Sequence, residues 1–248
     1  MTARVAHIWR HPIKSLGREA LEQVTLTAGK AMPWDRVWAI AHEASSANGS
    51  AWAPCHNFVR GAKAPSLQAI EARLNEDTGQ VALSHPERPD ITLHPERDAD
   101  VLVEWVRPLI PAQRAAPARV VRVPGRGLTD TDFPSISLHG LSSNRAIGQW
   151  LGQTLSPRRW RGNIWFEGLG PWEEFEWVGQ RIAVGEAVLE VRERITRCLA
   201  TTVNPETGRR DADTLRALEE GWGHRDFGVY AVVARSGRVA IGDEVKVI

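Results

Sequence analysis

The stretch Arg181-Ile-Ala-Val-Gly-Glu-Ala-Val-Leu-Glu-Val-Arg192 places two short apolar runs on either side of a Gly-Glu turn. Valine and isoleucine favour strands, and a two-residue turn that begins with glycine joins antiparallel strands into a hairpin. The same pattern returns near the end of the sequence, where residues 239–241 and 245–247 flank Gly242-Asp243. These hairpins predict a fold that is rich in β-structure.

Short strands separated by glycine and proline are predicted along most of the sequence. Alternating apolar residues between 70 and 74 lead through Asn75-Glu-Asp-Thr-Gly79 into residues 81–83, which indicates another hairpin. Further strands are expected at residues 5–9, 23–26, 37–41, 120–123, 163–166 and 229–234.

Two segments predict helices. Ser142 or Ser143 is expected to cap the first helix, and Asp211 or Asp213 the second, which would end at Gly221. The fold class expected is therefore mainly β with a few helices (α+β), with a barrel-like arrangement of strands. We place a domain boundary near residue 120, which separates a domain of residues 1–120 from one of residues 121–248.

Composition is that of an ordinary globular protein. The 248 residues are 42% hydrophobic, and 31 Lys+Arg against 30 Asp+Glu give a formal net charge of +1. This balance indicates no affinity for nucleic acid or for an anionic membrane. Neither a signal-peptide core nor an apolar run of about 18 residues is found, so we expect a cytoplasmic protein that does not span a membrane.

The chain has two cysteines, Cys55 and Cys198. They cannot supply the four thiolates of a ferredoxin-type cluster or of an all-cysteine zinc site. They also suggest no disulfide framework in a chain of this length, which favours a reducing compartment.

Familiar nucleotide-binding patterns are not matched. Gly125-Arg-Gly127 lacks the third glycine of a dinucleotide fingerprint and does not open a helix. Gly29-Lys30 has no glycine five residues before it, so it is not a phosphate-binding P-loop.

Three polar clusters next to predicted strands could carry chemistry. Cys198 is flanked by Arg194 and Arg197, and nearby cations favour the thiolate, although a single cysteine is often only a small packing residue. Arg161 offers a forked donor for phosphate two residues before Asn163, or it is simply solvated. The third cluster combines the turn at Lys14 and Ser15 with Asp35 and Arg36, which could merely pair with each other.

Together these clusters resemble the MOSC family, named after the C-terminal domain of molybdenum cofactor sulfurase, with its N-terminal β-barrel companion. Arg197-Cys-Leu-Ala-Thr-Thr-Val-Asn-Pro-Glu-Thr-Gly208 is similar to the family stretch R-C-x-x-T-T-V-D-P-x-T-G. His11-Pro-Ile-Lys-Ser-Leu16 resembles its P-[VI]-K-S turn. The other similar segments are Asp35-Arg-Val-Trp38, Trp160-Arg-Gly-Asn-Ile164 and Gly237-Arg-Val-Ala-Ile-Gly-Asp-Glu-Val245.

The resemblance implies a β-barrel MOSC domain that binds the molybdenum cofactor. Its relatives include the mitochondrial amidoxime reducing component, and carrying the motif over makes Cys198 the metal ligand and the catalytic residue. Positions around the pterin and its phosphate match Lys14, Ser15, Arg36, Arg161, Asn163 and Thr196. The expected activity is a molybdenum-dependent reduction of small N-hydroxylated compounds. The electrons would come from a separate ferredoxin- or cytochrome-type donor with its reductase.

Two other functions stay open: a cofactor or sulfur carrier without turnover, and a metal-free hydrolase or interaction module. The sequence also departs from the family pattern. Gly162 replaces the usual proline, Asn204 replaces aspartate, and His139-Gly-Leu-Ser142 stands where E-A-S is common. Cys55-His56 has no clear counterpart in the family pattern. We therefore expect the substrate pocket to differ more than the cofactor site.

Overall fold

The computed structural model describes residues 3–248, which form fifteen strands and three α-helices. The expected fold class, mainly β with a few helices, is confirmed. The α-helices are α1 (Ala99–Val106), α2 (Leu141–Leu151) and α3 (Thr214–Trp222). The strands are β1 (Arg4–Arg10), β2 (Glu19–Leu21), β3 (Gln23–Leu26), β4 (Trp38–His42), β5 (Glu71–Asn75), β6 (Gln80–His85), β7 (Arg88–Leu93), β8 (Pro117–Arg122), β9 (Ile136–Gly140), β10 (Ile164–Glu167), β11 (Arg181–Val184), β12 (Ala187–Thr196), β13 (Asp226–Arg235), β14 (Gly237–Ala240) and β15 (Val245–Val247).

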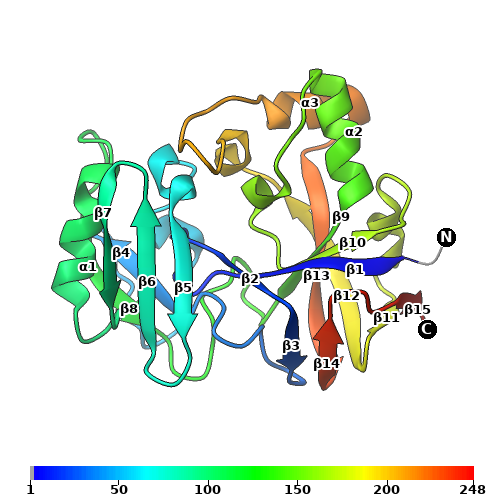
Figure 1. Cartoon of the computed structure of the whole chain (residues 1–248), viewed down its shortest axis with the longest axis horizontal. Coiled ribbons are helices and arrows are strands. Elements are labelled where there is room, and N and C mark those ends of the chain that lie inside the picture. Colours follow the sequence, from blue (N-terminus) through cyan, green and yellow to red (C-terminus); the bar gives the residue numbers. More distant parts are fainter. Residues whose placement is uncertain (1–2) are drawn as a thin grey trace.

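The largest sheet has eight strands in the order β15-β11-β12-β13-β9-β10-β1-β2, and it curls around one core (Figure 1). Only the β9–β10 pair is parallel. The sheet curls far enough for β1 to meet the segment before β15, where Gly242 N donates to Val5 O at 2.8 Å and Val245 N donates to Ala3 O at 3.0 Å. These bonds satisfy backbone groups that an open edge would leave unpaired.

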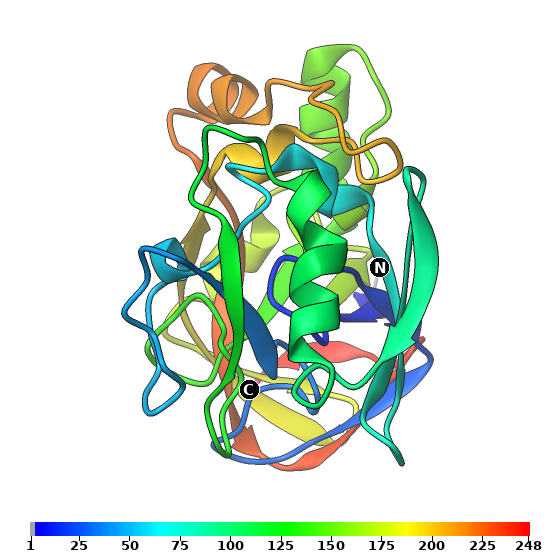
Figure 2. The same cartoon turned by 90° about the vertical axis from the view of Figure 1, so that its left-hand side faces the viewer.

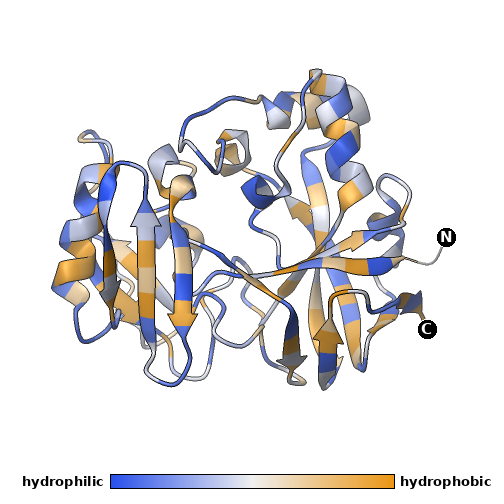
Figure 3. Cartoon of the chain, viewed as in Figure 1, coloured by the Kyte–Doolittle hydropathy of each residue, from blue (hydrophilic) through white to orange (hydrophobic). Residues whose placement is uncertain are grey.

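Alternating side chains on these strands fill the barrel, and Figure 3 shows the apolar bands that they form along the strands. The opening hairpin behaves as its pattern predicts, since Arg181 pairs with Glu190 and Val184 with Ala187 around the Gly185-Glu186 turn. Inward-facing residues of the barrel include Ile136, Leu138, Ile164, Phe166, Ile182, Val184, Leu189 and Val191.

A second unit lies beside the barrel (Figures 1 and 2). It contains the two-stranded sheet β4–β8, the three-stranded sheet β5–β6–β7, and α1, which lies between the two small sheets in Figure 2. Leu102, Trp105 and Val106 of α1 pack with Trp38 and Ile40 of β4 into a second core. The unit therefore has its own apolar interior.

The division at residue 120 stays a prediction, but the chain passes between the two units more than once. β1 and β2 belong to the barrel sheet, and β3 pairs with β14, so three strands within residues 4–26 join strands of the C-terminal half. Conversely, β8 pairs with β4 in the second unit, although the sequence suggested that residues 120–123 open the C-terminal block.

Some elements were missed by the sequence analysis. No element was predicted for β2, β7, α1 or β9. In α1, Val101, Val103 and Val106 are β-branched, so local propensity does not favour a helix, and burial against the small sheets decides its conformation.

The second predicted helix is α3, and Asp213 caps it by accepting a hydrogen bond from Arg216 N. Its predicted end at Gly221 was wrong, because α3 continues to Trp222 and Gly223 adopts the left-handed conformation at φ 74°.

The start of α2 was also predicted wrongly in detail. Its N-cap is Gly140, without a side-chain cap, rather than Ser142 or Ser143. The carboxylate of Glu174 occupies that end, accepting from Gly140 N at 3.2 Å and from Ser143 Oγ at 2.9 Å. Glu174 is fully buried, and this burial raises its pKa despite the hydrogen bonds.

Replacing Glu174 by glutamine is expected to change how stability depends on pH. Because the folded state raises the pKa of Glu174, the unfolded chain ionises first, and the wild-type protein loses stability as pH rises from about 4 towards 7. The variant lacks this loss, so the melting temperature of the variant minus that of the wild type, measured by calorimetry, should increase as pH rises across that range. Glu176→Gln, at an exposed position in the same segment, is the matched control. A difference in melting temperature that does not change with pH would contradict the assignment.

Candidate functional site

A cavity of about 590 Å³ opens between the barrel and the second unit. It gathers six of the seven residues predicted from the sequence: Lys14, Ser15, Arg36, Arg161, Thr196 and Cys198. Its other polar or reactive lining residues are Cys55, Arg60, Gln68, Asp130, Thr131, Asp132, Ser137, Arg159, Glu193, Arg194, Arg197, Thr201 and Tyr230. Cationic side chains outnumber carboxylates in this lining, so the cavity favours an anionic ligand.

Cys198 presents an exposed thiol at this cavity. It follows the end of β12 by two residues and precedes a short 3-10 helix, η6 (Leu199–Thr202). The carbonyl of Cys198 accepts from both the backbone N and the Oγ1 of Thr201 at 3.1 Å. Gln68 Nε2 in the second unit donates to Ala200 O at 3.0 Å. The turn that carries the thiol is therefore held by both units.

Arg161 has the chemistry of an anion site. Its terminal nitrogens, Nη1 and Nη2, are buried and have no hydrogen-bond partner in the structure. Burial lowers its pKa to about 9, with a further contribution from the neighbouring charge of Arg36. A guanidinium normally keeps its proton, so this buried cation is paired most favourably with an anion in the cavity.

Arg36 is placed by a buried network. Asp35 Oδ1 accepts from His11 N at 2.8 Å, and Asp35 Oδ2 accepts from Arg36 Nη1. The other end of the Arg36 guanidinium, Nη2, donates to Arg161 O at 2.9 Å. The pairing of Asp35 with Arg36 that the sequence suggested is thus present, and it also connects Arg36 to the backbone of Arg161.

The charges of this network follow from its burial. Burial, followed by the charges of Arg161 and Arg36, lowers the pKa of His11 to about 3, so its ring is neutral and donates from Nδ1 to Asp35 Oδ1, 3.3 Å away. Burial would raise the pKa of Asp35, but Arg36 and the His11 hydrogen bond outweigh it and hold that pKa below its ordinary value. Asp35 is therefore a carboxylate whose main counter-charge is Arg36.

Other predicted residues already have protein partners. Lys14 Nζ donates to Leu128 O at 2.8 Å and to Asp130 Oδ1 at 2.5 Å. Thr196 Oγ1 donates to Asp226 Oδ1 at 2.7 Å. A ligand at these positions would have to share or displace these hydrogen bonds.

Asn163 does not line the cavity. Its side chain is buried, where it accepts from Ser137 Oγ at 3.0 Å and donates to Trp9 O at 3.1 Å. It thereby joins β1 and β9 to the start of β10. In this structure Asn163 supports the strands that shape the cavity, and direct contact with a cofactor stays a prediction.

The sequence analysis did not include Tyr230, the single tyrosine of the chain, among the site residues. It projects from β13 into the cavity lining. Burial, with a smaller effect of Asp130, raises the pKa of its phenol, so the hydroxyl keeps its proton. Strand alternation alone could not reveal it, because residues 229–234 form an almost continuous apolar run.

The departures at positions 139 and 162 are explained by one contact. His139 is fully buried, and its ring stacks on those of Trp165 and Phe227, with ring centroids 4.8 Å and 5.5 Å apart. A Cβ at position 162 would lie 2.1 Å from His139 Cδ2, so glycine is required where the family pattern has proline. A Cβ at Gly228 would lie 2.1 Å from His139 Nδ1.

Replacing Gly162 by alanine is therefore expected to destabilise the protein by about 1–3 kcal/mol through overpacking against the histidine. In a double-mutant cycle measured by urea unfolding, His139→Ala should remove part of this cost, since it removes the colliding ring but leaves Trp165 Nε1 2.8 Å from the new Cβ. Gly228→Ala is the comparison. His139→Ala should not rescue it, because Gly228 has φ 74° and its Cβ would also lie 2.7 Å from Leu138 O. Strictly additive effects of Gly162→Ala and His139→Ala would contradict this account.

Within residues 3–248, no group of three or more His, Cys, Asp or Glu side chains comes together as a metal site. In the same part of the chain, no helix has the length and apolar character needed to cross a membrane.

Comparison with known families matches two models to this chain. The MOSC N-terminal beta barrel domain matches residues 2–158, and the MOSC domain matches residues 134–246. Among curated proteins, a molybdenum cofactor sulfurase from Anopheles gambiae is 35% identical over 77 residues. That region is 31% of this chain and 10% of the sulfurase, so the chain spans a small part of that relative.

Two solved structures show weaker likeness. The YUAD protein from Bacillus subtilis is 15% identical, with a TM-score of 0.49, over 100% of this chain and 96% of that one. YiiM from Geobacillus stearothermophilus is 16% identical, with a TM-score of 0.37, over 46% of this chain and 53% of its own.

Proposed function

Since the chain belongs to the MOSC family, we propose that it binds the molybdenum cofactor through Cys198 and uses it to reduce small N-hydroxylated compounds. The observation that carries the proposal is that one cavity contains both an exposed thiol and a buried guanidinium without a hydrogen-bond partner. Cys198 and Arg161 line the same cavity, and the two terminal nitrogens of Arg161 have no acceptor.

The residues present fit such a cofactor. A soft thiolate suits a metal that is already held by the dithiolene sulfurs of a pterin. The pterin phosphate is an anion, and Arg161, Arg36 and Arg197 offer forked donors to it within one cavity. When bound, the cofactor would supply the two-electron chemistry, while the protein supplies binding, orientation and electrostatics.

The protein residues then divide into four roles. Cys198 anchors the metal, the arginines hold the anionic end of the cofactor, and Asp35 positions Arg36 for that task. Tyr230 Oη keeps its proton and can donate a hydrogen bond to the oxygen of a substrate in the cavity. These assignments are supported by the family resemblance around Cys198 and by the hydrogen bonds of the side chains that line the cavity.

We further propose that the electrons come from a separate ferredoxin- or cytochrome-type protein. The two cysteines of the chain cannot hold an iron–sulfur cluster, and its sequence has no flavin or nicotinamide fingerprint. The substrate would be a small molecule, because it must share a cavity of about 590 Å³ with the cofactor.

Metal analysis of protein produced in cells that make the cofactor tests the first half of the proposal. Molybdenum should co-purify with the chain, together with a pterin that is detected by its fluorescence after oxidation. The absence of both would contradict the reductase and the carrier alike. Turnover is then tested with reduced viologen and an N-hydroxylated substrate. A protein that holds molybdenum but does not oxidise viologen would be a cofactor or sulfur carrier, which is the alternative function.

A further inference from the structure

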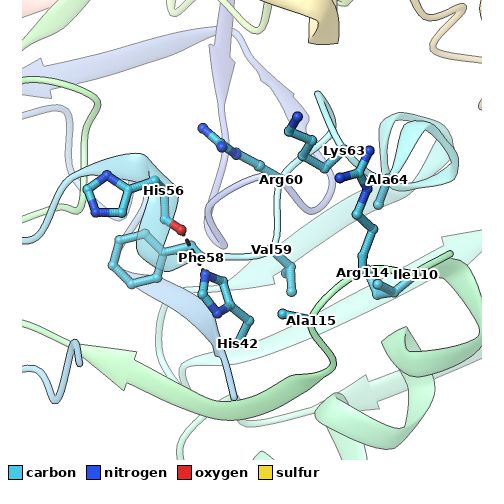
Figure 4. A pocket seen from close by; sticks show the side chains of 10 residues that line it. All are labelled: His42, His56, Phe58, Val59, Arg60, Lys63, Ala64, Ile110, Arg114 and Ala115. Carbon is cyan, nitrogen blue, oxygen red and sulfur yellow. Dashed lines mark hydrogen bonds between the residues drawn. The ribbon is translucent and has the colours of Figure 1, made fainter. Parts of the chain in front are cut away.

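A second, smaller hollow lies in the unit beside the barrel (Figure 4). Its volume is about 200 Å³, below the usual range of sites for drug-sized ligands, so it leaves room only for a small molecule. The hollow is lined by His42 at the end of β4, the turn from His56 to Ala64, and the loop from Ile110 to Ala115. Arg60 is its only lining residue that also lines the larger cavity described above.

The polar side of this hollow is cationic. Arg60, Lys63 and Arg114 line it, and no carboxylate does. Among residues 3–248, none of the three forms a salt bridge. Elsewhere the arginines Arg10, Arg18, Arg158 and Arg159 each pair with a carboxylate. Like charges that face one hollow without a counter-charge repel each other, and an anionic ligand would relieve that repulsion.

The nearest acidic residue in the sequence does not neutralise this rim. Glu43 follows His42, and its Oε1 accepts from Ala116 N at 3.1 Å, while its own backbone N donates to Ala116 O. The Glu43 carboxylate therefore ties β4 to the segment before β8, outside the residues that line the hollow.

The base of the hollow is apolar and rigid. Phe58, Val59 and Ala64 are buried, and Ile110 and Ala115 complete the apolar lining. His42 Nε2 lies 2.7 Å from His56 O, and a carbonyl can only accept, so Nε2 carries the proton and the ring is fixed. Figure 4 shows this bond below the cationic side chains of Arg60, Lys63 and Arg114.

We propose that this hollow is a binding site for a small organic carboxylate with an aromatic or branched apolar body. The carboxylate would lie among Arg60, Lys63 and Arg114, because guanidinium and ammonium groups form charge-assisted hydrogen bonds with it. The apolar body would pack against Phe58, Val59 and Ile110, and of these only Ile110 still has apolar surface to remove from water. The site does not depend on the molybdenum cofactor, and it is distinct from the pocket proposed for N-hydroxylated substrates.

Arg60 connects this site to the larger cavity. Its Nη1 donates to Cys55 Sγ at 3.4 Å, and Cys55 lines the larger cavity. When a carboxylate in the hollow takes up the Arg60 guanidinium, Cys55 Sγ loses that hydrogen bond, and its surroundings in the larger cavity change.

Calorimetric titration of the full chain with benzoate tests the site. Benzoate should bind saturably, and benzamide, its uncharged counterpart, should bind at least about tenfold more weakly. Lys63→Glu/Arg114→Glu should weaken benzoate binding at least about tenfold. Lys30→Glu/Arg235→Glu carries the same change in net charge at exposed positions outside the hollow, and it should bind like the wild type.

Binding to the larger cavity is distinguished by Arg161→Gln, which should leave benzoate affinity unchanged. Four results would each overturn the proposal. They are loss of benzoate binding in Arg161→Gln, equal binding of benzamide, no saturable binding at millimolar benzoate, and unchanged binding by the Lys63→Glu/Arg114→Glu protein.

A second measurement uses Cys198→Ala protein, in which iodoacetamide can alkylate only Cys55. Benzoate should change the rate of that alkylation several-fold, because Arg60 leaves Cys55 Sγ, and the charge-reversed double variant should show no such effect. An alkylation rate that benzoate leaves unchanged would refute the role of Arg60.

Discussion

Changing Cys198 to alanine is expected to abolish molybdenum retention, with a loss of metal per chain and of viologen-dependent turnover of at least about a hundredfold. Loss of a supporting residue alone costs about 10–100-fold in metal affinity, and loss of a ligand costs more. The larger effect follows from the site itself, because no group of three or more metal-binding side chains exists among residues 3–248 to take over. Metal analysis of the purified variant measures the retention directly, without reliance on activity.

The matched control for Cys198 is its neighbour. Leu199 is 48% exposed, and only its backbone carbonyl is involved in hydrogen bonds, so Leu199→Ala leaves the turn and the thiol in place. It should retain molybdenum at the wild-type level. A Cys198→Ala protein that keeps its molybdenum and its turnover would remove the thiolate from the proposed mechanism.

Changing Asp35 to asparagine is expected to cost about 3–5 kcal/mol of stability at neutral pH, the range measured when one partner of a buried ion pair is removed. Asp35 is 1% exposed, and it is the partner of both Arg36 Nη1 and His11 N. Without its charge, Arg36 remains buried beside Arg161, whose own guanidinium ends are unpaired. Chemical denaturation of the cofactor-free proteins measures the difference.

The dependence of this loss on pH provides a second check. The folded state lowers the pKa of Asp35, so its contribution is present above the ordinary aspartate range and disappears as falling pH protonates the carboxylate. The difference between wild type and Asp35→Asn should therefore shrink in acid. Asp90→Asn, at an exposed position, should change stability by no more than about 0.5 kcal/mol. An Asp35→Asn protein as stable as the wild type at neutral pH would refute the role of this ion pair.

Asp35→Asn also separates positioning from binding. If Asp35 acts on the cofactor only through Arg36, then Arg36→Leu and Asp35→Asn should weaken anion binding in the cavity by similar factors, and the double variant should be little worse. The free energy of unfolding should not follow the same pattern. The double variant should be more stable than Asp35→Asn alone, because it no longer contains the buried Arg36 cation without its partner.

Much of the fold could be predicted from local sequence. The hairpins around Gly185-Glu186 and between β5 and β6 form where alternating apolar residues meet a turn sequence, because a strand with one buried face specifies its own register. The helix α1 could not be predicted in this way. Its valines favour strands, and the surrounding small sheets impose the helix by burying Leu102, Trp105 and Val106.

The candidate site shows the same division. The motif around Cys198 identified the thiol and the flanking Arg194 and Arg197, since a reactive cysteine and its cations can be close in sequence. Tyr230 and Arg60 carried no such signal, because Tyr230 reaches the cavity from β13 and Arg60 from the turn between His56 and Ala64, which is distant in sequence from Cys198. Asn163 shows the converse, since it occupies a motif position but its side chain supports the strands.

The sequence by itself determined the β-rich class and the family resemblance and predicted Cys198 as the thiol of the site, because turn chemistry, alternation and short motifs are local properties. Only the tertiary structure decided which charges face each other. It left Arg161 unpaired in the cavity that Cys198 also lines, paired Asp35 with Arg36, and joined Arg60, Lys63 and Arg114 around one hollow. Electrostatic interactions depend on distance in space and on burial, and neither quantity is encoded in the spacing of residues along the chain.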